Sequence, residues 1–182
     1  MSQYKLVNPI IGGSFETTYK GKTQLEAGRN AWDSMSTYLT GSVPKFLFTL
    51  QNTNDGQLHH FTVNETVTHG KNIEYSLNEL QLNMTTDQQK NFKNQLTKVD
   101  KKVSGLQNGG KHRKDDDSSS SSSSDDEEFY EKLRYMKNKY SQPITYWWYN
   151  PIVYGVDNLY IPTFTVPLTP YVHVNLTSAF LN

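Results

Sequence analysis

The stretch from Pro143 to Asn182 limits the possible folds of this 182-residue chain more than any other. It holds five of the seven prolines, together with the aromatic run Tyr146-Trp147-Trp148-Tyr149. Each proline fixes φ, lacks an amide donor and favours extended geometry in the residue before it. We therefore expect residues 141–182 to form short extended β pieces that pack on the rest of the chain or on a partner. Neither a helix nor the interior strands of a large sheet are expected here.

The composition indicates that only part of the chain is packed. Hydrophobic residues make up 35% of the sequence, against about 45–50% in ordinary domains by a count that also includes glycine. Aromatic residues, at 13%, still bring large areas that can be buried in a core. Cysteine is absent, which excludes disulfides, thiolate metal sites and a cysteine nucleophile.

Residues 1–84 predict a small α+β domain. Residues 4–19 have the pattern of two strands joined by a glycine turn, although Asn8-Pro9 interrupts the first strand. Residues 45–50 and 58–63 predict a hairpin, because Asp55-Gly56 between them is a strong turn signal.

A helix is expected between these two pairs of strands. Thr23 and Glu26 form a capping-box pattern, apolar residues then recur on one face as far as Leu39, and Gly41 is placed to end the helix. The order ββαββ implies a small antiparallel sheet with one packed helix. Residues 73–82 alternate only in part, so a further strand and a lead-in to the next helix both stay open.

Two further helices are expected beyond this domain. Residues 85–103 carry apolar residues at steps of four, three and four, and residues 129–140 repeat the same spacing. The two matching stripes suit a helical hairpin. They suit equally well two helices that lie separately on the main body, and both arrangements stay open.

The segment between these helices, residues 104–128, has the most unusual composition in the chain. A glycine-rich start leads to Lys111-His-Arg-Lys114, three aspartates, seven serines from Ser118 to Ser124, and four acidic residues. It has no apolar area to offset the entropy of ordering it, so we expect a disordered linker. Ser122, Ser123 and Ser124 each precede an acidic residue by three positions, the pattern of acidophilic kinases, and are candidate phosphorylation sites. A spacer that is never modified is the alternative.

The sequence contains no catalytic motif. It has no phosphate-cradling glycine loop, no nucleophile elbow and no cluster of histidines and carboxylates at ligand spacing. His59 and His60 are adjacent in a predicted strand, so they face opposite ways and cannot chelate one ion together. His173 is expected at a half-exposed strand position. We therefore predict a protein that is not an enzyme and has no cofactor, metal site or small-molecule substrate.

Aromatic residues of the C-terminal segment are the candidate protein interface. Interface cores favour tyrosine and tryptophan, and successive strand residues face opposite sides. We therefore expect one of Trp147 and Trp148 to be buried and the other to be exposed or at an interface. The alternative is that all four residues of the run Tyr146–Tyr149 anchor the segment to the chain's own body. The candidate interface residues are Tyr146, Trp147, Trp148, Tyr149, Tyr154, Tyr160, Phe164 and Tyr171.

The C-terminal segment also carries a family resemblance. Residues 141–154, SQPITYWWYNPIVY, and residues 160–172, YIPTFTVPLTPYV, resemble a poorly characterised protein family of nucleocytoplasmic large DNA viruses, the giant viruses. The N-terminal residues 8–15 and the basic and serine/aspartate linker extend the likeness. The resemblance implies a late viral product that is made at the viral factory in the host cytoplasm and packaged in the virion. It transfers no catalytic residue.

Two function classes follow from these observations. The first is a non-enzymatic structural or interaction protein, a minor virion component whose partners are proteins. The alternative is a nucleic-acid-binding accessory protein that uses exposed aromatics for stacking beside the lysine-rich helix of residues 85–103. Lysine plus arginine equal aspartate plus glutamate at 18 each, so any such contact must be local. No secretion signal or membrane span is seen, and we expect an intracellular, soluble product.

Overall fold

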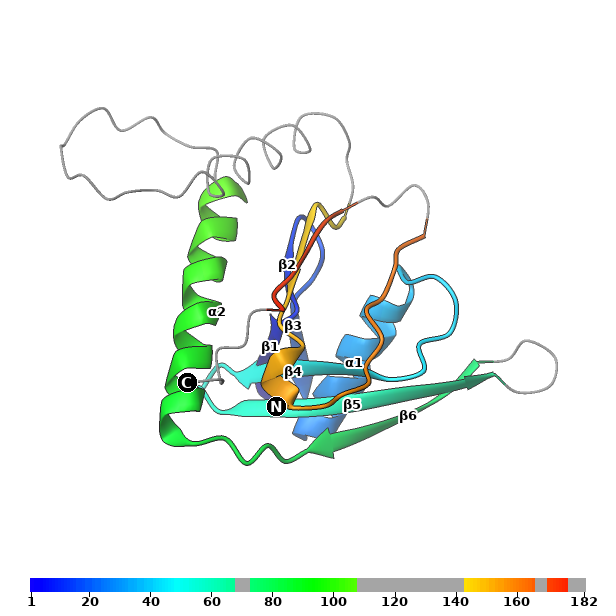
Figure 1. Cartoon of the computed structure of the whole chain (residues 1–182), viewed down its shortest axis with the longest axis horizontal. Helices are drawn as coiled ribbons and strands as arrows, with labels where there is room; N and C mark the ends of the chain where they lie inside the picture. The colour runs from blue at the N-terminus through cyan, green and yellow to red at the C-terminus, as the bar shows by residue number, and fades with distance from the viewer. Residues whose placement is uncertain (68–72, 108–142, 166–169, 177–182) are drawn as a thin grey trace.

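The structure of the protein is a computed structural model. It describes residues 1–67, 73–107, 143–165 and 170–176. The predicted helix at 129–140 and most of the predicted linker lie outside these ranges. The fold is mixed α+β, as expected, with two sheets and two α-helices among the described residues (Figure 1).

The larger sheet has five antiparallel strands. Its spatial order is β3-β1-β4-β5-β6, so β4 lies at the centre and β6 at one edge. The sequence predicted the β4–β5 hairpin and left residues 73–82 open. Residues 73–80 of that range form the edge strand β6. The strands are β1 (Ser2–Asn8), β3 (Thr18–Gly21), β4 (Phe46–Asn52), β5 (Leu58–Val67) and β6 (Ile73–Leu80).

Helix α1 (Gln24–Ser36) covers one face of this sheet. Thr23 and Glu26 cap its start, as predicted: the Thr23 hydroxyl accepts from the Glu26 amide at 3.2 Å, and the Glu26 carboxylate accepts from the amide of Lys22, one residue before the N-cap, at 2.7 Å. Trp32 is fully buried and lies 5.8 Å from the ring of Phe46, centroid to centroid. The helix ends at Ser36, five residues before the glycine that was expected to stop it.

The second sheet joins two segments that are far apart in sequence. Strand β2 (Ile10–Gly12) pairs antiparallel with β7 (Tyr146–Tyr149), and β8 (Tyr171–Val174) adds in parallel to the other side of β7. The first strand pair was therefore predicted correctly, because β1 does pair with β3, but the glycine turn between them was wrong. After the cis bond at Asn8-Pro9, the chain leaves the large sheet and pairs with the C-terminal segment instead.

Helix α2 (Thr86–Gln107) lies along the second sheet (Figure 1). Its apolar stripe is buried on the body through Phe92, Leu96 and Val103. A Cβ atom added at Gly12 would lie 2.9 Å from a methyl carbon of Val103, so the helix approaches β2 closely. Of the two arrangements left open by the sequence, α2 therefore has the one in which its stripe packs on the main body. It also extends four residues beyond the predicted end at 103.

Candidate functional site

The aromatic run of the C-terminal segment is part of the protein's own core. Tyr146, Trp147, Trp148 and Tyr149 are all buried, and so is Tyr154 in the short 3₁₀ helix η1 (Ile152–Tyr154). The prediction that one of the two tryptophans is exposed is wrong. These five candidate interface residues anchor the segment to the chain, which for the run Tyr146–Tyr149 is the alternative that the sequence left open.

The alternation along β7 is as expected, but both of its sides are covered. Trp147 and Tyr149 turn toward Phe46 of the large sheet, with ring centroids 6.4 and 5.3 Å away. Tyr146 lies on the opposite side, near Gly12 and Val103, where α2 packs. The sequence could not reveal this second cover, because α2 and β7 are separate segments whose meeting depends on the fold.

The other three candidate interface residues are only partly buried. Phe164 packs edge-on against Trp147 at 5.0 Å, and Tyr171 stacks on Tyr146 at 6.0 Å. The amide of Tyr160 donates to the carbonyl oxygen of Lys45 at 2.8 Å. Each of these residues thus also contacts the chain's own body.

A buried polar network joins the N-terminal and C-terminal segments. The Asn8 side chain accepts from the Asn150 amide at 3.0 Å and donates to the Asn150 carbonyl oxygen at 2.9 Å. Its amide nitrogen also donates to the Tyr154 hydroxyl at 2.9 Å. That hydroxyl lies 2.9 Å from the Thr49 hydroxyl, which in turn lies 2.9 Å from Nδ1 of His60.

One assignment of the hydrogens satisfies the side chains of this network together. The amide nitrogen of Asn8 can only donate, so the Tyr154 oxygen accepts from it. In this assignment Tyr154 gives its own hydrogen to Thr49. Thr49 then gives its hydrogen to His60, so in this assignment Nδ1 accepts and the imidazole proton sits on Nε2. Each hydroxyl hydrogen between Asn8 and His60 is then donated in a hydrogen bond, as buried polar groups require.

The same environment keeps His60 neutral. Burial lowers the pKa of its imidazole to about 4, and the nearby His59 acts in the same direction while Glu79 acts against it. A protonated Nδ1 would also face a hydroxyl whose hydrogen already points toward it. Burial likewise raises the pKa of Tyr154. The network is therefore a set of neutral, mutually satisfied groups, and its arrangement supports a structural role.

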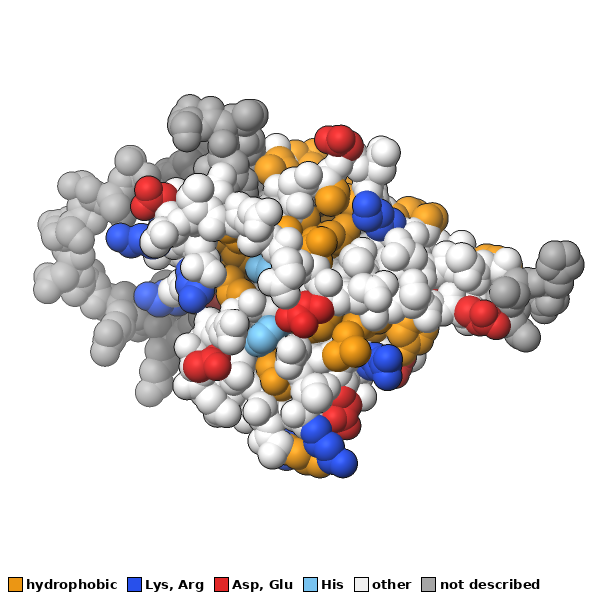
Figure 2. Space-filling model, turned by 90° about the horizontal axis from the view of Figure 1, so that it is seen from below, with side chains coloured by type: hydrophobic (Ala, Val, Ile, Leu, Met, Phe, Trp, Pro, Cys, Tyr) orange, Lys and Arg blue, Asp and Glu red, His pale blue; other side chains and the backbone are white. Residues whose placement is uncertain are grey.

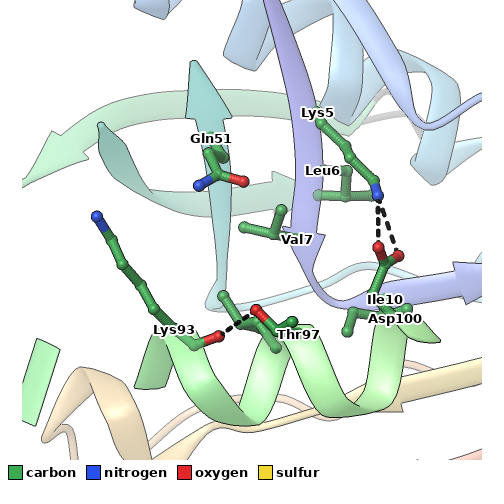
Figure 3. Close-up of a pocket in the computed structure, with 9 residues that line it drawn as sticks. Lys5, Leu6, Val7, Ile10, Gln51, Lys93, Thr97 and Asp100 are labelled. Carbon is green, nitrogen blue, oxygen red and sulfur yellow. Dashed lines mark hydrogen bonds and ion pairs between the residues drawn. The ribbon is translucent and has the colours of Figure 1, made fainter. Parts of the chain in front are cut away.

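A cleft of about 190 Å³ lies between α2 and the strands β1 and β4 (Figure 3). Its walls include the apolar side chains of Leu6, Ile10 and Leu96. Lys5 and Asp100 face each other across it, with Lys5 Nζ at 3.0 and 2.9 Å from the two carboxylate oxygens (Figure 3). The two opposite charges are paired with each other, and this ion pair links α2 to β1.

The hairpin of β5 and β6 carries exposed apolar side chains at its far end. Pairing places Val67 opposite Ile73 and Glu65 opposite Tyr75, so all four side chains share one face. The exposed fractions of Val67, Ile73 and Tyr75 are 61%, 50% and 39%. We call these three residues the hairpin row. Figure 2 shows the hairpin as a narrow arm that projects beyond the body, with hydrophobic side chains beside its base and near its tip.

The hairpin row continues the core face of the sheet. The next pair inward, Val63 opposite Leu77, is buried. The Tyr75 ring lies 6.4 Å from that of Trp32, and its hydroxyl donates to Asp33 at 2.8 Å, so this face is the one that α1 covers. The sequence showed the alternation of residues 73, 75 and 77. It did not show that β6 would be an outer strand, and the row was missed for that reason.

The remaining sequence predictions have mixed outcomes. His59 and His60 face opposite sides, with His59 3.1 Å from Glu79 and His60 on Thr49. His173 lies exposed on β8, at the edge of the second sheet. The candidate phosphorylation sites Ser122, Ser123 and Ser124 lie outside the described residues and stay a prediction.

Two further searches of the described residues concern membranes and metals. Within the described ranges, neither helix is long and apolar enough to cross a membrane. Across the same ranges, no three histidine, aspartate or glutamate side chains come together in a way that could hold a metal ion.

The fold and these sites define a mixed α+β protein whose aromatic tail is built into its own core. No family model and no solved structure matches the chain. The chain is similar to a protein of Acanthamoeba polyphaga mimivirus that is described as uncharacterized. The two are 26% identical over 105 residues, which cover 58% of this chain and 59% of the mimivirus protein, so less than two thirds of that relative is matched. This similarity suggests a giant-virus protein family.

Proposed function

We propose that this protein is a non-enzymatic interaction protein of a giant virus, a minor virion component that binds another protein through the β5–β6 hairpin. The observation that carries the proposal is the hairpin row. Val67, Ile73 and Tyr75 extend an apolar core face into solvent at the edge of a sheet. Exposed apolar surface at a sheet edge is typical of protein interaction sites.

The interior of the protein supports a binding role over a catalytic one. Three buried side chains are of types that can act in catalysis, namely Thr49, His60 and Tyr154. They are hydrogen-bonded to one another and to Asn8. The one close ion pair at the cleft, Lys5 with Asp100, is likewise self-satisfied. These contacts stabilise the fold and hold their groups in fixed, paired states.

The proposed partner contact lies on the β5–β6 hairpin and not on the C-terminal aromatic residues. The run Tyr146–Tyr149 is buried, so it supplies neither an interface nor the stacking platform of the nucleic-acid alternative. The lysines of α2 would still suit that alternative, but no exposed aromatic of the described C-terminal segment accompanies them. The hairpin is therefore the surface with the better support.

Site-specific photo-crosslinking in infected cells tests the proposal. A photo-reactive residue at Ile73 is expected to capture viral protein, whereas the same residue at Lys98, an exposed position on α2, is not. Nucleic-acid adducts from position 98 would support the alternative function instead. Proteomics of purified particles against infected-cell lysate tests the virion assignment, and absence from particles would refute it.

A further inference from the structure

The outer edge of β6 is an open strand edge. All eight residues of β6 pair with β5 on the inner side, and among the described residues no strand pairs with the outer side. Six of the eight side chains, all but those of Leu77 and Leu80, are exposed. An unpaired edge presents a row of backbone donors and acceptors that can accept another strand.

The residues of β6 restrict which strand could fit there. Ile73, Tyr75 and Leu77 lie on the α1 face, and Glu74 and Ser76 lie on the other. A partner strand should therefore present apolar side chains on the α1 face at every second position. It should also avoid a carboxylate opposite Glu74.

We infer that this partner strand is β6 of a second copy of the chain, paired antiparallel with Tyr75 opposite Tyr75 at a two-fold axis. The inference rests on the proposed function, and it names the partner of the hairpin. In this register Ile73 lies opposite Leu77 of the second copy, and Leu77 lies opposite its Ile73. Glu74 lies opposite Ser76, so apolar meets apolar on one face and no like charges meet on the other.

Neighbouring registers lose this match. A two-fold axis at Ser76 places Ile73 opposite Glu79, and an axis at Glu74 places two carboxylates opposite each other. An axis between two residues would place side chains that point to opposite faces directly opposite each other, which the pleat of an antiparallel pair does not allow. A parallel arrangement of the two outer edges turns one copy over, so the apolar α1 face of one strand would adjoin the polar face of the other. The sequence of β6 is thus self-complementary in one register.

The pairing joins two five-stranded sheets into one continuous sheet of ten. Both α1 helices then lie on the same face, because a two-fold axis perpendicular to the sheet keeps that face in common. The two Tyr75 residues lie opposite each other at the centre of the new row, each ring beside Trp32 of its own copy. Ile73 is covered by the partner's strand, whereas Val67 on β5 lies one strand farther away. Substitutions at Ile73 and at Val67 therefore form a matched pair, because only Ile73 would lie next to the partner's strand.

Ile73→Lys and Val67→Lys separate edge pairing from a general apolar contact. Both residues lie at the far end of the hairpin, on one face, directly opposite each other. Analytical ultracentrifugation over a range of concentrations is expected to show a reversible dimer for the wild type. Ile73→Lys is expected to weaken it by roughly tenfold or more, the scale of a charge placed opposite an apolar residue, and Val67→Lys by much less. An equal loss in both variants overturns the edge-pairing inference.

Cysteine cross-linking tests the register. The chain contains no cysteine, so Tyr75→Cys introduces a single thiol. At the two-fold axis the two Cβ atoms would be about 4.5–5.5 Å apart, close enough for a disulfide or a short bifunctional cross-linker. Asn78→Cys is the control, because the register separates the two thiols by six residues along the strands, about 20 Å. Thermal melting of each variant establishes that the monomer is folded.

The outcomes separate this inference from the proposed function. Covalent dimer from Tyr75→Cys, and little from Asn78→Cys, supports the self-pairing. A wild type that stays monomeric at every concentration, or an equal yield from both cysteines, overturns it. Capture of a different viral protein from position 73 by a monomeric chain overturns the self-pairing while the proposed interaction function stands.

Discussion

The buried network around His60 makes the stability of the protein depend on pH in a predictable window. The unfolded chain binds a proton at this residue near pH 6.5, the ordinary pKa of histidine. The folded protein does so only near pH 4, since burial lowers the pKa of His60 to about 4. Between these values the unfolded state holds more protons, so the free energy of unfolding decreases as the pH falls.

The size of this effect follows from the two pKa values. The full difference between 6.5 and about 4 corresponds to about 3 kcal/mol, at about 1.4 kcal/mol for each tenfold change in proton affinity. About 2 kcal/mol of this free energy should be lost by pH 5, where His60 is almost fully protonated in the unfolded chain but not in the folded protein. For a domain whose total stability is about 5–15 kcal/mol, such a loss is easily measured.

Urea denaturation of matched variants between pH 7 and pH 4 isolates the contribution of His60. His60→Asn places an amide oxygen near the position of Nδ1, so it can still accept from Thr49, but it cannot titrate. This variant should be less stable at every pH because it loses ring packing, and its dependence on pH should be weaker by about 3 kcal/mol over the window. His59→Asn, at the adjacent residue on the opposite face, is the control: it should keep most of the pH dependence, because burial and not His59 is the larger cause of the low pKa of His60.

Two results would refute this reasoning. A wild-type pH dependence that persists unchanged in His60→Asn would show that other groups, such as carboxylates, cause it. Nitrogen chemical shifts of the wild-type imidazole give the second test. They should show the proton on Nε2 of His60 down to about pH 5, and a proton on Nδ1 or titration near pH 6.5 would contradict the hydrogen-bond direction.

Three further predictions concern other parts of the chain. Trp147→Ala and Trp148→Ala should each lower the free energy of unfolding by about 3–5 kcal/mol, because both indoles are buried; a loss from only one of them in urea unfolding would contradict the two-sided cover of β7. Gly13→Ala should be more destabilising than Gly41→Ala. Both glycines have positive φ, but a Cβ at Gly13 would lie 2.3 Å from a backbone carbonyl oxygen and one at Gly41 would meet nothing within 4 Å. Mass spectrometry of protein from infected cells should find phosphates within residues 118–124, and a linker peptide recovered only unmodified would end that hypothesis.

Locally encoded elements were predictable from the sequence. The start of α1 follows from Thr23 and Glu26, whose bonds to neighbouring amides involve residues no more than four apart. The β4–β5 hairpin follows from Asp55-Gly56, and Gly56 has the positive φ that such a turn requires. In each case the signal and the structure it specifies lie within a few residues of one another.

Pairings between distant segments were not predictable in this way. Ile10 pairs with Trp148, and Asn8 bonds to Asn150 and Tyr154, across well over a hundred residues. The sequence showed a strand at residues 10 and 11 and an extended aromatic segment near the C-terminus. Nothing local indicates that the two belong to one sheet, so residues 10 and 11 were assigned to the N-terminal strand pair instead.

For the same reason, the sequence alone does not show whether aromatic residues lie in an interface or in the protein core. An aromatic run such as Tyr146–Tyr149 has the composition of an interface core and of a protein core alike, because both bury large side chains away from water. The outcome depends on what covers each side, here Phe46 on one side and α2 on the other. The sparse row of Val67, Ile73 and Tyr75 has a weaker compositional signal, but it is left uncovered at a sheet edge. Position in the fold, more than richness in aromatic residues, therefore identifies the surface that is free to bind.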